Sequence, residues 1–321
     1  MVSGMDDSTD DIPLVAIVGP TGVGKTAMAV GLGRRWPIEV VSVDSRQVYR
    51  RMDVGTGKPS PAERRAVPHH LIDVAEPDER YDAARFARDA ARAIDAIRAR
   101  GRWPVLVGGT GLYLRALVRG LTPLPPADPG LRRRFRADAA ARGPEALHAR
   151  LAAVDPETAR RLHPRDVLRV VRALEIATLT GEPASAAWRA RPAGPGHYRL
   201  LAIGLTMARD ALYATLDARV DRMLSQGLED EVKGLLDAGY GTDLPAMQSI
   251  GYRHLAPVVA EGTSLATAVR GMKRDTRRYA KRQWTWFAAE AVAAWVTMDP
   301  EEPECAVAEV NKTLERSQVF G

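Results

Sequence analysis

The sequence predicts an α/β protein whose parallel sheet is interrupted by an all-helical insertion. Three observations support this fold class. Short apolar runs that are typical of buried strands are followed by glycine-rich or acidic turns and then by helical patterns. Residues 122–194 are rich in arginine, alanine and leucine but show no strand pattern. A strand pattern returns at Tyr198–Leu205, so we expect the sheet to resume after the insertion.

The first apolar run, Leu14–Val18, leads directly into the sequence GPTGVGKT. A strand, this glycine spacing and a helix that opens with Lys-Thr together predict a phosphate-binding loop in a P-loop NTPase-like core. The glycines let backbone N–H groups approach an anion, and the end of the helix adds a positive dipole. The expected diphosphate-binding residues are Gly19, Pro20, Thr21, Gly22, Val23, Gly24, Lys25 and Thr26. The Thr26 hydroxyl is also the expected ligand for Mg²⁺.

Two further side chains follow predicted strands. Asp44 comes directly after the β-branched run Glu39–Val43, and Thr110 lies in the glycine turn after Pro104–Val107. Ligands of an open parallel sheet collect at the carboxyl ends of its strands, so both residues should lie near the phosphate loop. Either residue could instead simply cap the next helix. The residue pattern alone leaves both roles open.

Residues 50–79 are rich in proline, glycine and charge, and we expect a functional loop or lid. His69 and His70 in this segment resemble metal ligands. No spaced third ligand accompanies them, so hydrogen bonds within the loop are the favoured interpretation. Beyond this segment, helices are expected at Tyr81–Arg100, Ala208–Gln226, 264–290 and Pro303–Arg316, with a last strand at Ala293–Met298.

Two stretches carry all of the excess positive charge. The chain has 46 Lys and Arg against 40 Asp and Glu, a net charge of +6. Residues 122–194 contain 13 Arg and 8 acidic residues (+5), and residues 270–282 contain 7 basic residues and one acid (+6). In the helix expected at 264–290, the basic side chains repeat on one face and lead into aromatic residues. Such a face suits a nucleic-acid backbone, and a solvated charged surface explains it equally well.

Composition is that of an ordinary globular protein, with 45% hydrophobic and 27% charged residues in a chain of 321. Cys305 is the only cysteine, which excludes a disulfide framework or a multi-cysteine zinc site and fits a reducing cytoplasm. No apolar run is long enough to cross a bilayer. We expect a discontinuous core domain at residues 12–121 and 195–316, a helical insertion domain at 122–194, and disordered tails at 1–11 and 317–321.

The phosphate loop leaves several functional classes open. A regulatory GTPase is excluded because Asn311 is the only asparagine and is followed by Lys-Thr-Leu rather than by the Lys-x-Asp of a base-reading element. A motor-type ATPase stays open, since Asp44 could hold Mg²⁺. A small-molecule kinase fits the core, and a non-catalytic, nucleotide-gated RNA-binding protein fits the basic stretches. The remaining class uses a diphosphate as leaving group and a nucleic acid as acceptor.

Several sequence blocks distinguish among these classes by their joint order. They are GPTGVGKT (19–26), SVDSRQVY (42–49), GTGKP (55–59), PHHLID (68–73), VGGTGLY (107–113), GLTPLPPADP (120–129), LHPRDVLRVVRALEI (162–176), ARVDRML (218–224), QSIGYR (248–253) and KRQWTWF (281–287). This series, from residue 13 to about residue 290, resembles the bacterial tRNA dimethylallyltransferase family. The phosphate loop alone is generic, whereas the order of the blocks is specific to that family.

The resemblance implies transfer of a dimethylallyl group from dimethylallyl diphosphate to N6 of adenine 37, in tRNAs that read codons beginning with U. The products are N6-(dimethylallyl)adenosine and diphosphate, with Mg²⁺ as cofactor. Asp44 matches the family's general base, Thr110 a threonine that positions the amine, and Arg219 an arginine that contacts the diphosphate. The chemistry agrees, because the delocalised adenine amine needs a base and the departing diphosphate needs positive charge.

The resemblance also implies where tRNA binds. The insertion would grip the anticodon arm, and adenine 37 would leave its stack to reach Asp44. The implied tRNA contacts are Asp44, Ser45, Arg46, Gln47, Thr110, Arg132, Arg253, Arg274, Arg278, Lys281, Arg282, Gln283 and Trp284. Arg46 stands where family members often have Met, and Thr215 stands where an arginine is common. We expect a cytoplasmic monomer.

Overall fold

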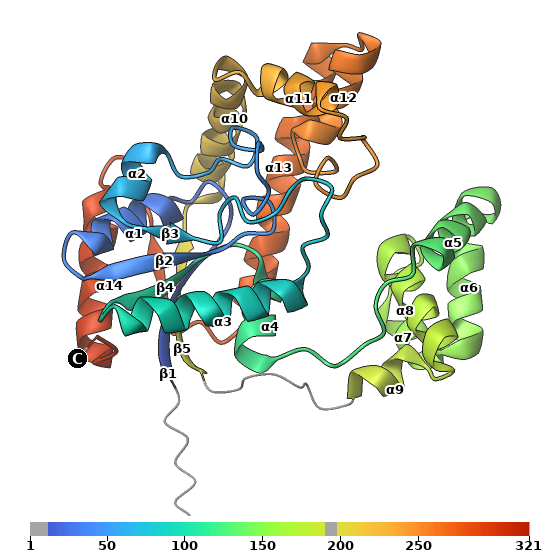
Figure 1. Cartoon of the computed structure of the whole chain (residues 1–321), viewed down its shortest axis with the longest axis horizontal. Coiled ribbons are helices and arrows are strands. Elements are labelled where there is room, and N and C mark those ends of the chain that lie inside the picture. The colour runs from blue at the N-terminus through green and yellow to red at the C-terminus, as the bar shows by residue number, and fades with distance from the viewer. Residues whose placement is uncertain (1–11, 190–197, 321) are drawn as a thin grey trace, which may run out of the picture. The chain divides into compact units, whose positions relative to one another are not determined.

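The computed structural model describes residues 12–189 and 198–320, which form two compact units (Figure 1). One unit contains the chain up to Val118 and from Pro195 onward, and the other is Arg119–Gly194. The second unit starts slightly before the expected insertion at residue 122. The expected N-terminal tail, residues 1–11, lies outside the described residues.

The first unit is built on a six-stranded parallel sheet with the strand order β3-β2-β4-β1-β5-β6. Strand β1 pairs with β4, which precedes the second unit in the sequence, and with β5, which follows it. The chain therefore returns to the same sheet, and the predicted α/β fold class is confirmed. The strands are β1 (Ile12–Val18), β2 (Ile38–Val43), β3 (His69–His70), β4 (Trp103–Gly108), β5 (Tyr198–Thr206) and β6 (Ala294–Thr297).

Helices cover both faces of this sheet, as a parallel sheet requires. Val15 and Ile17 of β1 share one apolar cluster with α1, α10 and α14, while Leu14 and Ala16, which alternate with them along the strand, are also fully buried. Helix α3 contacts β2 and β4. The helices of this unit are α1 (Lys25–Gly33), α2 (Pro61–Ala66), α3 (Ala83–Ala99), α4 (Gly111–Arg119), α10 (Arg209–Ser225), α11 (Leu228–Asp237), α12 (Tyr252–Glu261), α13 (Leu265–Ala288) and α14 (Pro303–Ser317).

The C-terminus differs from the sequence-based expectation. Residues 317–320 are described, and Val319 is buried in the main cluster. The ring of Phe320 lies 5.3 Å from that of Trp36 and 5.2 Å from that of Trp103. The prediction of a disordered tail is therefore wrong for these residues, because an aromatic side chain at the end of the chain completes the core.

The regular elements that the structure describes between Pro129 and Arg189 of the second unit are all helices. Its core contains Phe135, Leu151, Val170 and Leu174. An aspartate side chain accepts a backbone N–H bond at the start of α5, α7 and α8, which fixes where these helices begin. The helices are α5 (Pro129–Arg142), α6 (Pro144–Val154), α7 (Pro156–Arg161), α8 (Val167–Thr180) and α9 (Ala184–Arg189). In neither unit does a helix of described residues have the length and apolar character of a membrane span.

Candidate active site

The phosphate loop joins β1 to α1. Gly24, just before α1, has φ 99°, a left-handed conformation that favours glycine, and Lys25 is the first residue of the helix. The Lys25 ammonium donates hydrogen bonds to the carbonyls of Gly19 (3.0 Å) and Pro20 (2.8 Å). Val23 is buried in the core below the loop. The loop residues that face a cavity of about 360 Å³ are Thr21, Gly22, Gly24, Lys25 and Thr26.

Two cations in this cavity wall, Lys25 and Arg219, form no ion pair with a described residue. Burial lowers the pKa of Lys25 to about 8, an effect that the charge of Asp44 opposes and that of Arg219 reinforces. Burial likewise lowers the pKa of Arg219, which lies in α10. Within the described ranges neither side chain takes part in an ion pair. Because a poorly solvated, unpaired cation is unfavourable, an anion that enters the cavity would relieve both.

Helix α10 supplies a second arginine. Arg222, three residues after Arg219, also lines the first cavity. At position 215, where relatives often have arginine, the threonine hydroxyl points to the sulfur of Met207 at 3.9 Å. The helical spacing of Arg219 and Arg222 was visible in the sequence, but it did not single out Arg222 as a site residue.

Asp44 follows β2 at the carboxyl edge of the sheet. Its Oδ1 accepts backbone N–H bonds from Arg46 (2.8 Å) and Gln47 (3.3 Å), so the side chain does cap a turn. Its other oxygen, Oδ2, accepts no hydrogen bond from a described residue. Asp44 therefore keeps one carboxylate oxygen available beside the phosphate loop.

Thr110 lies close to this turn, because β2 and β4 are neighbouring parallel strands. Its hydroxyl oxygen accepts the backbone N–H of Ser45 at 3.1 Å and also hydrogen-bonds to the phenol of Tyr279 in α13. Burial and the negative charge of Asp44 raise the pKa of Tyr279 to about 12. The parallel topology therefore brings Asp44 and Thr110 together, and α13 adds Tyr279, which sequence reasoning missed.

A second cavity, of about 250 Å³, adjoins the first. Both cavities are lined by Thr21, Asp44, Thr56, Arg219 and Met223. The rest of the second wall contains Ser45 and Tyr279 together with three arginines, Arg46, Arg253 and Arg282. Asp44 and Arg219 therefore stand at the boundary between a phosphate-binding cavity and an arginine-rich one.

Two residues that are predicted to contact tRNA also have internal hydrogen bonds. The Gln283 side chain is buried, with 6% exposed; its Oε1 accepts the N–H of Thr21 (2.8 Å) and its Nε2 donates to the carbonyl of Gly109 (3.0 Å). Gln47 lies in the wall of the first cavity, where its amide bonds to Ser42 and to the carbonyl of Gly57. Their amides bond to neighbouring loops, and contact of these two side chains with tRNA stays a prediction.

Arg132 in the second unit is also committed. Its guanidinium donates two hydrogen bonds of 2.9 Å to the carboxylate of Glu175, which is fully buried. Arg132 therefore neutralises a buried charge within its own unit, and its part in binding tRNA stays a prediction.

The basic residues on and beside α13 fall into two groups. Arg253, Arg274 and Arg278 all surround one carboxylate, that of Asp275, at 2.7, 2.9 and 3.7 Å. Lys281 and Arg282 form no ion pair with any residue that the structure describes. Trp284 is 41% exposed, and its ring lies 4.8 Å from that of Trp295. Arg46 is held by a 2.8 Å bond to the carbonyl of Pro245.

Thr26 is the residue that fits Mg²⁺. Its hydroxyl is in the wall of the first cavity and makes no hydrogen bond to a described residue. Mg²⁺ is commonly held by one or two protein oxygens together with substrate phosphates and waters, so a hydroxyl beside a phosphate loop suits it. His69 hydrogen-bonds to the carbonyl of Val67 within the expected loop, whereas His70 hydrogen-bonds to Glu39 of β2. In the described ranges no group of three His, Cys, Asp or Glu residues is placed to bind a metal.

Comparison with known proteins agrees with this geometry. A family model described as IPP transferase matches residues 47–290, and one described as isopentenyl transferase matches residues 12–75. The chain is 49% identical to tRNA dimethylallyltransferase 2 of Geotalea uraniireducens, over 97% of this chain and 99% of that protein. It is 50% identical to the tRNA dimethylallyltransferase of Geobacter metallireducens, over 88% and 92% of the two chains.

Solved structures show the same likeness. The full-length tRNA isopentenylpyrophosphate transferase of Bacillus halodurans is 42% identical, with a TM-score of 0.68 and coverage of 96% of this chain and 99% of that one. A eukaryotic dimethylallyltransferase acting on tRNA is 28% identical, with a TM-score of 0.76 and coverage of 96% and 79%. These findings decide among the functional classes that the residue pattern left open. The chain belongs to the IPP transferase family of tRNA dimethylallyltransferases, which form N6-(dimethylallyl)adenosine at position 37 of tRNA.

Proposed function

We propose that dimethylallyl diphosphate occupies the first cavity and that adenine 37 arrives through the second, so that the amine meets the allylic carbon beside Asp44. The observation that carries this assignment is that Asp44 and Arg219 line both cavities. The first cavity offers loop N–H groups and unpaired cations to a diphosphate. The second offers arginines to a tRNA backbone.

In the proposed reaction the N6 lone pair forms a bond to C1 of the dimethylallyl group. The C1–O bond breaks, and its electron pair leaves with the diphosphate. Asp44 accepts the N6 proton, because the delocalised amine becomes nucleophilic only as that proton is removed. Thr110 holds the amine, and Lys25 with Arg219 stabilises the charge that grows on the leaving oxygen. Mg²⁺, bound at Thr26, would neutralise part of the diphosphate charge.

The tRNA surface that we propose consists of the second cavity and the exposed basic residues of α13. Ser45, Arg46, Arg253 and Arg282 line that cavity, and Lys281 and Trp284 are exposed on the same helix. The arginine-rich second unit would bind the anticodon arm. We further propose that the enzyme is a cytoplasmic monomer and that its substrates are tRNAs reading codons that begin with U, as the family likeness implies.

The direct test is incubation of the protein with tRNA, Mg²⁺ and dimethylallyl diphosphate, followed by mass spectrometry of the nucleosides. N6-(dimethylallyl)adenosine should form without ATP, and only in tRNAs that have adenine at position 36, which pairs with the first codon base. Modification of tRNAs irrespective of position 36 would contradict the proposed substrate range. Product that depends on ATP would contradict the use of the first cavity for a prenyl diphosphate.

Asp44→Asn tests the assignment of the base. Asparagine keeps the oxygen that caps the turn but cannot accept the amine proton, so kcat should fall by about 10²–10⁴ while tRNA affinity is retained. The measurements are single-turnover rates and tRNA binding. A variant with a rate near that of the unaltered enzyme would remove Asp44 from this role.

A further inference from the structure

One loop of the active site has no part in the reaction proposed above. The loop Met52–Pro59 contributes Val54, Thr56 and Gly57 to the wall of the first cavity, and Thr56 again to the second. It contains a lysine, Lys58, that also lines the first cavity. From its position, Lys58 could be taken for one more ligand of the diphosphate.

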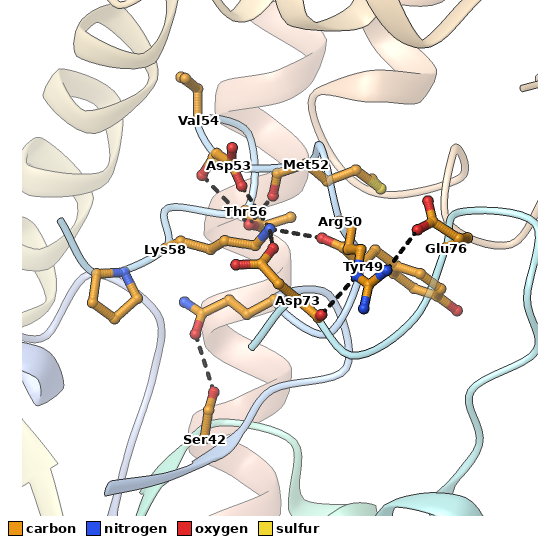
Figure 2. Close-up of polar contacts among 12 residues, drawn as sticks. Ser42, Tyr49, Arg50, Met52, Asp53, Val54, Thr56, Lys58, Asp73 and Glu76 are labelled. Carbon is orange, nitrogen blue, oxygen red and sulfur yellow. Dashed lines mark hydrogen bonds and ion pairs between the residues drawn. The ribbon is translucent and has the colours of Figure 1, made fainter. Parts of the chain in front are cut away.

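The contacts of Lys58 argue against that role. Its side chain is 2% exposed, and its ammonium donates to the carbonyl of Tyr49 (2.7 Å), to Asp53 Oδ1 (2.6 Å) and to the carboxylate of Asp73 (Figure 2). An ammonium has three protons, and these three acceptors use all of them. Lys58 therefore fastens the loop to the segment around Asp73 and has no hydrogen left for a ligand.

A carboxylate fixes the same loop from another side. Glu231 of α11 accepts the backbone N–H groups of Asp53 (2.8 Å), Val54 (2.7 Å) and Gly55 (3.0 Å). It also accepts the hydroxyl of Tyr252 at 2.6 Å. Three consecutive amides on one carboxylate hold the backbone in a single conformation, because hydrogen bonds to a charged acceptor are among the stronger ones.

The residue that this backbone presents to Arg219 is a glycine. Gly57 has φ 59°, and a Cβ placed there would lie 1.8 Å from Nη2 of Arg219 and 3.4 Å from Cε of Met223. Gln47 donates to the carbonyl of Gly57 at 3.1 Å and so adds another fixed point. The Arg219 guanidinium therefore lies directly against main chain, in space that any other residue would fill.

We propose that the loop Met52–Pro59 positions Arg219 for the diphosphate, with Lys58 and Glu231 fixing the loop and Gly57 leaving room for the guanidinium. Arg219 has no ion pair in the described chain, and a free arginine side chain can adopt many rotamers. A rigid surface beside it restricts these rotamers before the ligand binds, so less freedom is lost on binding. The inference rests on the role proposed above for Arg219.

The test compares two Gly→Ala variants. Gly57→Ala should push the guanidinium aside and raise the KM for dimethylallyl diphosphate by about ten- to a hundredfold at saturating tRNA, the value of one charge-assisted hydrogen bond. The KM for tRNA should stay unchanged. Gly101→Ala is the matched control, because Gly101 also has a left-handed conformation, φ 70°, but no atom lies within 4 Å of its Cβ position. Gly101→Ala should lower the free energy of unfolding by a similar amount and leave the KM for dimethylallyl diphosphate unchanged.

Arg219→Ala separates a failure of this inference from a failure of the role of Arg219. If Arg219→Ala leaves the diphosphate KM unchanged, the role proposed for Arg219 is wrong. If it raises the KM but Gly57→Ala behaves like Gly101→Ala, the positioning inference is wrong. If the role of Arg219 and the positioning inference are both correct, adding Gly57→Ala to Arg219→Ala should change the KM for dimethylallyl diphosphate less than twofold. The two substitutions then act through one side chain.

A second variant keeps the test decisive if Gly57→Ala does not fold. Glu231→Gln retains the shape of the side chain but weakens its bonds to the three loop amides, because the acceptor is no longer charged. It should raise the diphosphate KM several-fold and leave the KM for tRNA unchanged. An unchanged diphosphate KM in this folded variant would overturn the inference.

Discussion

The active site contains two loops with the pattern Gly-x-Gly-Lys, and their lysines behave in opposite ways. Lys25 in GVGK bonds only to carbonyls of its own loop and is an unpaired cation in the first cavity. Lys58 in GTGK lines the same cavity but is bound to the carboxylates of Asp53 and Asp73. The glycine spacing sets a turn in both places. Whether the lysine charge is available to a ligand depends on which acids the fold brings to it.

The difference has opposite consequences for stability. Burial lowers the pKa of Lys25 from 10.5 to about 8, so its protonated form is less favourable in the folded than in the unfolded chain. This residue destabilises the fold below pH 8, and the penalty disappears as pH rises from about 8 to about 10.5. Burial opposes ionisation of Asp73, but the bond and charge of Lys58, with those of Arg64, outweigh it and lower the pKa of Asp73. The stability that Asp73 gains from its lowered pKa is fully present above its unfolded-state pKa. It is lost as the pH falls through the lower, folded-state pKa of Asp73.

Lys58→Met should have the largest effect on stability. The variant leaves Asp73 and Asp53 without their shared cation, and we expect the free energy of unfolding to fall by about 2–3 kcal/mol. This is less than for a fully buried pair, because both carboxylates are partly exposed. Urea denaturation measures the change. If Lys58→Met is as stable as the unaltered protein, the ion pairs of Lys58 do not stabilise the fold, and Lys58 does not differ from Lys25 in this respect.

Lys25→Met should show the reverse pattern. Removing an unpaired buried cation should leave the free energy of unfolding unchanged or slightly higher, because its desolvation is relieved. The KM for dimethylallyl diphosphate should rise about thirtyfold, which corresponds to about 2 kcal/mol for a charge-assisted bond. Denaturation and steady-state kinetics together give both quantities. A large loss of stability with little change in KM would reverse our assignment of the two loops.

The pH dependence sharpens the contrast further. Since the pKa of Lys25 is lowered to about 8, kcat/KM for dimethylallyl diphosphate should fall above pH 8, by up to about tenfold per pH unit. Lys25→Arg should remove this decline, because arginine stays protonated throughout the range. The profile is measured from pH 6.5 to 9.5 at saturating tRNA, a range chosen at roughly 1.5 units on either side of that pKa. An identical decline in the Lys25→Arg variant would assign it to another group.

The smallest expected effect is on the salt dependence of tRNA binding, where paired and unpaired cations of α13 can also be compared. Lys281 and Arg282 have no acidic partner in the described chain, whereas Arg274 and Arg278 share Asp275. Replacing the first pair by alanine should reduce the slope of log Kd against log salt by roughly 0.7–0.9 per residue. Replacing the second pair should reduce it less. Equal changes would show that the Asp275 ion pairs do not limit phosphate contact.

Sequence reasoning succeeded where a local pattern determines geometry. The phosphate loop needs only a strand, its glycines and a helix start, and these are contiguous in the chain. Asp44 and Thr110 belong to different segments, yet the rule that parallel strands present their carboxyl ends at one edge placed them together correctly. The return to the sheet at β5 was likewise readable, because strand periodicity reappears after a long helical stretch.

Sequence reasoning missed contacts between residues that are distant in the chain. The amide of Gln283, a predicted tRNA contact, also bonds to Thr21, 262 residues away. The guanidinium of Arg132, another predicted tRNA contact, pairs with Glu175 of the same unit. Phe320 was placed in a disordered tail, although it packs on Trp36 and Trp103.

The sequence by itself determined the fold class, the phosphate loop and, through the order of its blocks, the family. Only the tertiary structure decided which cations are free: among the residues that the structure describes, Lys25 and Arg219 form no ion pair, whereas Lys58 and Arg132 do. The physical reason is that backbone geometry follows from neighbouring residues, while the electrostatic state of a side chain depends on groups that folding brings from elsewhere.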